Sequence, residues 1–175
     1  MELDAAIQKR HSTRKFKKKA PDWRDVLECV DAARYAPMAG NNYTLKFILV
    51  KDPKTIQKLA DAAQQQFIAQ ASYIGVFCSN SKRIVNLYGK RGEKYLKQQA
   101  GAAIQNFLLK IQEKKLATCW IGAFVDYLVK DILKIPENIE VEALFPIGYE
   151  AEKVRKKRRI ELNEILYFEK YGKKK

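Results

Sequence analysis

The stretch EKYLKQQAGAAIQNFLLKIQEK, residues 93–114, carries the strongest periodic pattern in the chain. Its apolar side chains recur at the spacing of three and four residues that marks one face of a helix. They are Leu96, Ala100, Ala103, Ile104, Phe107, Leu108 and Ile111. The pattern predicts a long helix, rich in small residues, at the centre of the molecule or at a subunit interface.

The segments on either side predict helices and strands that alternate along the chain. Short apolar runs rich in branched residues predict strands at 45–50, 73–78 and 141–147, and a short extended piece at 116–121. Helical spacing predicts helices at 2–9, 53–65 and 126–133, and one that an Asp22 N-cap opens and Pro37 stops. We expect loops at 10–21 and 79–91. This order predicts one α+β domain, residues 1–175, built around one sheet.

The last part of the chain is basic and then amphipathic. Its apolar residues, spread over 160–168, follow an exposed basic segment and have no obvious place in the core of their own domain. We therefore expect the tail, about residues 160–175, to pack on a partner subunit.

Bulk composition excludes several classes of protein. With 47% hydrophobic and 31% charged residues the chain is globular, and no apolar run approaches the roughly 20 residues that cross a bilayer. Residues 1–16 lack the apolar stretch of a secretory signal, so we expect a cytoplasmic protein with no membrane partner. Cys29, Cys78 and Cys119 are predicted to be buried thiols, and the single His11 excludes a zinc site built on histidine pairs.

The net charge of +14 favours anionic partners. Lysine and arginine concentrate at 14–19, at 153–159 and at 173–175. A solvated face is the alternative interpretation of such runs. The charge narrows the class of partner without naming one.

Motifs for hydrolysis are absent from the sequence, which has no GxSxG, P-loop or HExxH and no GxGxxG after a strand. Three clusters can bind anions instead. Arg10, Ser12 and Arg14 alternate along one segment, and guanidinium groups grip phosphate by charge-assisted hydrogen bonds. Lys157 and Arg159 form the second cluster, and the turn at 37–41 forms the third. Each alone is typical of solvated surface, so their meaning depends on whether the fold unites them.

These clusters and their surroundings resemble the FMN-dependent nitroreductases over nearly the whole chain. The motifs that carry the resemblance keep the family's order: RHSTRKF at 10–16, APMAGNN at 36–42, QQFIAQA at 65–71, YGKRG at 88–92 with QAGAAIQNFLL at 99–109, TCWIGAF at 118–124, PIGY at 146–149 and KRR at 157–159. TCWIGAF is the most specific of them. The resemblance implies an α+β fold with a mostly antiparallel central sheet flanked by helices, in an intertwined homodimer.

The resemblance also implies roles for single residues. Arg10, Lys157 and Arg159 would hold the FMN phosphate, while Ser12 and Arg14, with Gln65 nearby, would bond the pyrimidine edge. Pro37, Met38, Ala39 and Asn41 would come from the second subunit and lie against the isoalloxazine. Backbone groups of Gly122 and Ala123 would face flavin N5, and His11 and Ile121 complete the predicted cofactor-binding set.

The implied activity is reduction of nitroaromatic, quinone or similar small acceptors by NADH or NADPH, in a ping-pong cycle of hydride transfer through flavin N5. It needs no catalytic acid or base from the protein. The chain departs from the family where Tyr43, Thr44 and Leu45 replace glutamine-proline-tryptophan, and where Met38 and Ala39 replace serines. We expect these departures to affect the specificity for the electron acceptor more than the binding of the flavin.

Two alternatives stay open. The same fold could carry another FMN reaction, such as reductive dehalogenation or flavin fragmentation. A basic nucleic-acid-binding protein would explain the charge and the tyrosine and phenylalanine content, but the sequence holds no recognised nucleic-acid motif. We therefore favour the enzyme and expect no nucleic-acid partner.

Overall fold

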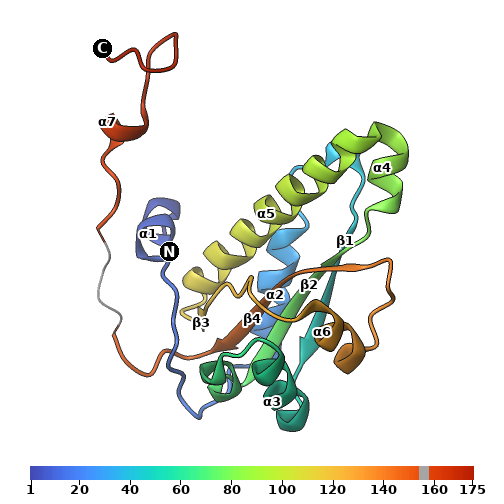
Figure 1. Ribbon diagram of the computed structural model, residues 1–175. Helices are drawn as coiled ribbons and strands as arrows, with labels where there is room; N and C mark the ends of the chain where they lie inside the picture. Colours follow the sequence, from blue (N-terminus) through green and yellow to red (C-terminus); the bar gives the residue numbers. More distant parts are fainter. Residues whose placement is uncertain (154–157) are drawn as a thin grey trace.

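A four-stranded antiparallel sheet forms the centre of the computed structural model, which describes residues 1–153 and 158–175. Its strands lie in the order β1 (Leu45–Val50), β2 (Tyr73–Ser79), β4 (Glu140–Gly148) and β3 (Ala117–Thr118) (Figure 1). Every pair is antiparallel, and the β2–β4 register shifts between Phe77 and Cys78. The predicted α+β class with one sheet is confirmed.

Helices cover both faces of the sheet. Their bounds are α1 (Leu3–Lys9), α2 (Trp23–Ala33), α3 (Pro53–Ala62), α4 (Lys82–Tyr88), α5 (Lys90–Glu113), α6 (Asp126–Leu133) and α7 (Leu162–Ile165), with short 3₁₀ turns η1 (Ala39–Asn41) and η2 (Gln66–Gln70). Asp22 caps α2 as predicted, because its carboxylate accepts from Arg24 N at 2.9 Å. No described helix is both long and apolar enough to cross a membrane.

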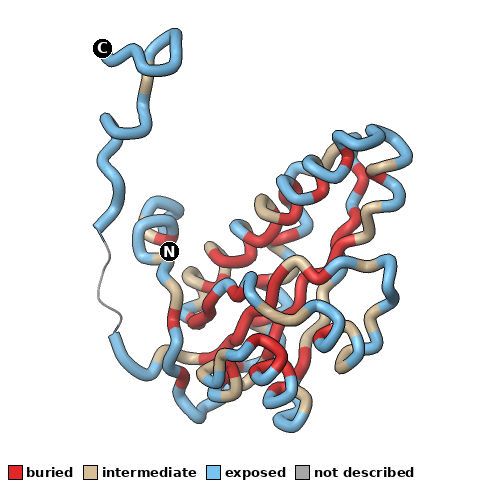
Figure 2. The backbone as a smooth tube through the Cα atoms, in the orientation of Figure 1, coloured by how far each residue is buried: buried red, intermediate tan, exposed pale blue. Residues whose placement is uncertain are grey.

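Alternation along the central strands divides the core into two halves. Phe77 and Phe145 face α2 and α5, whereas their neighbours Val76 and Leu144 face α3 and α6. Successive side chains of a strand point to opposite faces, so one run of apolar residues serves both layers. The buried residues run along the sheet and the adjoining side of α5 (Figure 2).

Aromatic rings join α5 to the sheet. The ring centroid of Phe107 lies 5.5 Å from that of Phe77 and 5.3 Å from that of Phe145, both nearly edge to face. Each such pair contributes about 0.5–1.5 kcal/mol beyond area burial. The helix at 93–114 is therefore the central helix of the domain, as its periodicity predicts.

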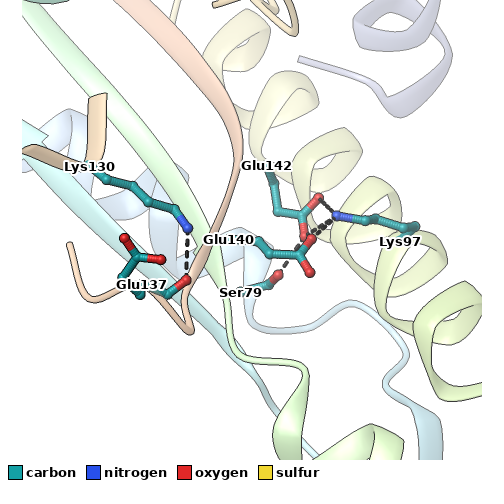
Figure 3. Close-up of polar contacts among 6 residues, drawn as sticks. All are labelled: Ser79, Lys97, Lys130, Glu137, Glu140 and Glu142. Atoms are coloured by element: carbon teal, nitrogen blue, oxygen red, sulfur yellow. Dashed lines mark hydrogen bonds and ion pairs between the residues drawn. The ribbon is translucent and has the colours of Figure 1, made fainter. Parts of the chain in front are cut away.

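A polar network attaches the first half of α5 to the end of the sheet (Figure 3). Lys97 Nζ donates to both oxygens of Glu142 at 3.1 Å and also to Glu140, while Ser79 Oγ donates to Glu142 at 2.5 Å. Burial alone lowers the pKa of Lys97, but these hydrogen bonds outweigh it, so the pKa is raised. Lys97 therefore stays charged, and it holds the helix against β2 and β4.

The prediction of a loop at 79–91 is wrong, because helix α4 occupies 82–88 and α5 already begins at Lys90. Gly89, with φ of 56°, ends α4 and separates it from α5. A Cβ on Gly92 would lie 2.6 Å from Ile84 O, so only glycine permits this close approach. Helix α4 has one fully buried residue, Ile84, in seven, and a single buried position leaves no apolar periodicity to detect.

The tail after residue 158 stays outside the core. Helix α7 is four residues long, and the apolar side chains around it are exposed: Ile160, Leu162, Ile165, Leu166 and Phe168. These apolar side chains therefore lie outside the core of the described residues, and the predicted place of the tail at 160–175 on a second subunit stays a prediction.

Candidate functional site

The basic segment after α1 is paired with the edge of the sheet. Thr13 N donates to Thr118 O at 2.9 Å, Lys17 N donates to Tyr149 O at 2.9 Å, and Ala151 N donates to Lys15 O at 3.0 Å. Phe16, which is buried, forms a bridge with Glu150. These backbone bonds fix an otherwise solvated segment beside β3 and the end of β4.

A cleft of about 550 Å³ opens where this segment meets α1, α5 and β3. Its walls bring residues from both ends of the chain together: Ile7, Gln8, Arg10, His11, Ser12, Gln105, Leu108, Thr118, Trp120 and Arg159. Arg159 Nη2 donates to Arg10 O at 3.3 Å. Arg10, Ser12 and Arg159, from two of the predicted anion-binding clusters, therefore share one cleft. Arg14 does not line it, and Lys157 lies outside the described residues.

His11 is held between two hydrogen-bond acceptors. Its Nδ1 lies 2.8 Å from Lys9 O, and its Nε2 lies 2.7 Å from Glu150 Oε1. A neutral imidazole has a single N–H, so the ring can donate to both acceptors only when it is doubly protonated. Burial lowers the pKa of His11, but the bonds to Lys9 and Glu150 and the charge of Glu150 outweigh it and raise the pKa. When His11 is protonated, the cleft therefore holds an imidazolium beside the guanidinium groups of Arg10 and Arg159.

Thr118 is the one buried polar side chain without a hydrogen-bond partner within the described chain. Thr118 is 4% exposed, and it lines both the main cleft and an adjoining cavity of about 200 Å³. An unpaired buried hydroxyl costs stability unless a ligand or water satisfies it. Trp120, next to it, is 43% exposed and offers a ring at the mouth of the cleft.

Arg14 and Gln65 lie near the loop that contains Gly122 and Ala123. The guanidinium carbon of Arg14 lies 6.0 Å from the centre of the Phe67 ring, and Gln65 Nε2 donates to Ala123 O at 3.4 Å. Gly122 and Ala123 are exposed, and a Cβ on Gly122 would meet nothing within 4 Å. The predicted pyrimidine-edge residue Gln65 therefore contacts the predicted flavin-facing loop.

Ile121 anchors that loop. Its side chain is buried, and its backbone N and O both pair with Leu144 at 3.0 Å. Its contribution to the site is therefore to hold Gly122 and Ala123 in place.

The turn at 37–41 lies apart from the cleft within one chain. Ala39 N donates to Gln99 Oε1 at 3.1 Å, and a Cβ on Gly40 would lie 2.6 Å from the Tyr88 hydroxyl. Met38 is packed against the core on the α5 side. None of Pro37, Met38, Ala39 and Asn41 lines the cleft beside Trp120. Their predicted contact with a cofactor requires a second subunit.

Sequence reasoning missed several residues of this region: Gln105, Thr118, Trp120 and Glu150. Thr118 and Trp120 stand in the TCWIGAF motif, so the motif was the available signal. No local sequence signal marks Glu150, because its partners Thr13 and His11 are 137 and 139 residues away along the chain.

We predict that the pKa of His11 lies above its ordinary value of 6.5 and falls in Glu150→Gln, which removes the carboxylate charge. The chain has one histidine, so proton NMR titration of untagged protein reports it alone. Because folding raises this pKa, the pair contributes to the free energy of unfolding below pH 6.5 and loses that contribution as the pH rises through the folded-state pKa. A wild-type pKa at or below 6.5, or no change in the variant, would contradict the ion pair.

The sequence and the fold were compared with known proteins. The sequence model of the nitroreductase family matches residues 7–149. A protein of Archaeoglobus fulgidus, provisionally named NADH dehydrogenase/NAD(P)H nitroreductase, is 28% identical over 148 residues, which is 82% of each chain. A nitroreductase family protein of Clostridium novyi NT superposes with a TM-score of 0.81 at 29% identity, covering 99% of this chain and 96% of the other.

A solved structure named as an FMN-dependent nitroreductase of Clostridium difficile R20291 shares the fold, with a TM-score of 0.83 at 21% identity and coverage of 96% and 99%. The predicted fold and the predicted class of oxidoreductase are confirmed. Since the family match spans most of the 175 residues, the chain belongs to the nitroreductase family.

Proposed function

We propose that the protein is an FMN-dependent oxidoreductase that uses NADH or NADPH to reduce nitroaromatic, quinone or similar small acceptors. The observation that carries this proposal is the shared cleft of Arg10 and Arg159, residues from opposite ends of the chain. The family supports it, as do the NAD(P)H nitroreductase name of one relative and the FMN-dependent nitroreductase name of one structural neighbour.

The cleft suits a phosphorylated ring compound. Its volume of about 550 Å³ lies within the usual range of roughly 300–1,000 Å³ for small-ligand pockets. Arg10 and Arg159 provide donors for a phosphate, Ser12 provides a hydroxyl for the ring edge, and Trp120 and Leu108 provide apolar walls. The unpaired hydroxyl of Thr118 gives a further group for a ligand to satisfy. These residues fit FMN.

Each group then has a task. Arg10 and Arg159, with His11 as a third cation, would hold the phosphate; Ser12, Arg14 and Gln65 would orient the pyrimidine edge. A fixed cation at Arg14 would ease acceptance of electrons, because negative charge accumulates at that edge. The chemistry that bound FMN supplies is two-electron transfer from the nicotinamide to the acceptor. The exposed backbone at Gly122 and Ala123 leaves room for both partners.

We propose that the protein works as a homodimer. Two features support this: the turn at 37–41 lies outside the cleft of its own chain, and the tail around α7 exposes apolar side chains.

We expect sedimentation equilibrium to give twice the chain mass of 20.2 kDa, and removal of residues 160–175 to weaken association. Apolar surface released from water drives such contacts. A full-length monomer at assay concentrations would contradict the dimer, and a fully dimeric truncated protein would contradict the role of the tail.

We expect the double variant Arg10→Ala/Arg159→Ala to bind FMN about a hundredfold more weakly, since two charge-assisted hydrogen bonds are lost. Titration of the flavin absorbance with apoprotein measures the affinity. The control Lys54→Ala/Lys58→Ala removes the same charge from exposed positions of α3 and should leave FMN binding unchanged.

Unchanged affinity in the Arg10/Arg159 variant would show that the phosphate lies elsewhere. A wild-type protein that is colourless and refuses added FMN would contradict the proposed function itself. If FMN binds, reduction by NADH or NADPH without oxygen, followed by nitroaromatic, quinone or halogenated phenol, identifies the acceptor class and tests the dehalogenation alternative.

A further inference from the structure

A second and larger cleft, of about 700 Å³, lies between the start of β1 and helix α4. One wall comes from Gly40, Asn42, Tyr43, Thr44 and Lys46, and the other from Asn80, Lys82, Arg83, Asn86 and Leu87. The two clefts share no lining residue. This second cleft is referred to as the β1–α4 cleft.

The β1–α4 cleft is positively charged. Lys46, Lys82 and Arg83 line it, no carboxylate does, and none of the three lies within 4 Å of a carboxylate oxygen of the described residues. Lys114 of the same chain behaves differently, since it pairs with both Asp25 and Glu28. Three unpaired cations around one cavity attract an anion with more than one negative charge.

The other lining groups match a nucleotide rather than a bare phosphate. Tyr43 is 44% exposed and Leu87 is 57% exposed, so a flat ring could stack on one and contact the other. Asn80 and Asn86 place amide groups, each both donor and acceptor, in the same cavity. Cations for phosphate, an aromatic surface and amides are the groups that bind a phosphorylated base and sugar.

The position of the β1–α4 cleft indicates which nucleotide. Gly40 belongs to the turn at 37–41 that the proposed dimer sets against the flavin of the partner subunit, and Asn42 follows that turn directly. A ligand in this cleft would therefore extend toward that flavin, as the electron donor must. NADPH differs from NADH by one phosphate on the adenosine ribose, and a phosphate monoester carries about −1.5 to −2 charges at pH 7.

We propose that the β1–α4 cleft binds the adenosine 2′-phosphate end of NADPH and that Lys46, Lys82 and Arg83 make NADPH the preferred donor. This inference rests on the proposed function. It also accounts for part of the +14 charge that the FMN cleft does not use.

Calorimetric titration with adenosine 2′,5′-bisphosphate tests the cleft without catalysis. Full-length protein should bind this probe about tenfold more tightly than adenosine 5′-monophosphate, and the preference should shrink with salt. The variant Lys46→Gln/Lys82→Gln/Arg83→Gln should lose this preference for the bisphosphate. The control Lys51→Gln/Lys54→Gln/Lys58→Gln removes equal charge beyond the other end of β1 and should retain it.

Equal affinity for the two probes, or a preference that survives in the cleft variant, would overturn the inference. In the flavin-loaded enzyme the same variant should lower kcat/KM about tenfold for NADPH and little for NADH. Loss of flavin, or equal loss with both donors, would also overturn it. A protein that binds no FMN yet prefers the bisphosphate would contradict the proposed function and support the nucleotide site, so the two failures are distinguishable.

Discussion

The backbone pairing of residues 13–17 with Thr118 and Tyr149 is the constraint on which the site depends. It turns a lysine-rich segment, which could not bury itself, into an extension of the sheet edge. Register matters here, because a shift by one residue exchanges the side chains that face inward and outward. With Thr13 buried and Phe16 in the core, Arg10 and Ser12 are left at the cleft.

Cationic side chains line the cleft that this pairing creates. Arg10, Arg159 and His11 line it, and Glu150 is the carboxylate that pairs with His11 when the imidazole is protonated. A phosphate between these cations would relieve their repulsion and gain charge-assisted hydrogen bonds. An anion in this position therefore fits the physical chemistry of these side chains as well as the family to which the chain belongs.

Sequence patterns predicted the regular elements well where burial is periodic. The strand at 45–50 and the helix at 126–133 have the predicted bounds, and the long amphipathic pattern at 93–114 is the central helix. Helix α4 could not be predicted in this way, because it has one fully buried residue and ends at a glycine. Local patterns fail where a short element is stabilised by a neighbouring helix rather than by its own apolar face.

The site was predictable only in part, and for a different reason. The anion-binding clusters were visible as residue types, but the meeting of Arg10 and Arg159 depends on a contact across 149 residues, which no local pattern encodes. The family resemblance supplied that expectation for Arg10 and Arg159. It did not indicate Glu150, whose role follows from the geometry around His11, nor the unpaired hydroxyl of Thr118.

The central claim is that the two ends of the chain form one phosphate-binding cleft. Comparison of FMN with riboflavin, which lacks the phosphate, tests it most directly by equilibrium titration of the wild-type apoprotein. Two or three charge-assisted hydrogen bonds to the phosphate predict that FMN binds at least about a hundredfold more tightly. Equal affinity for the two flavins would contradict the account.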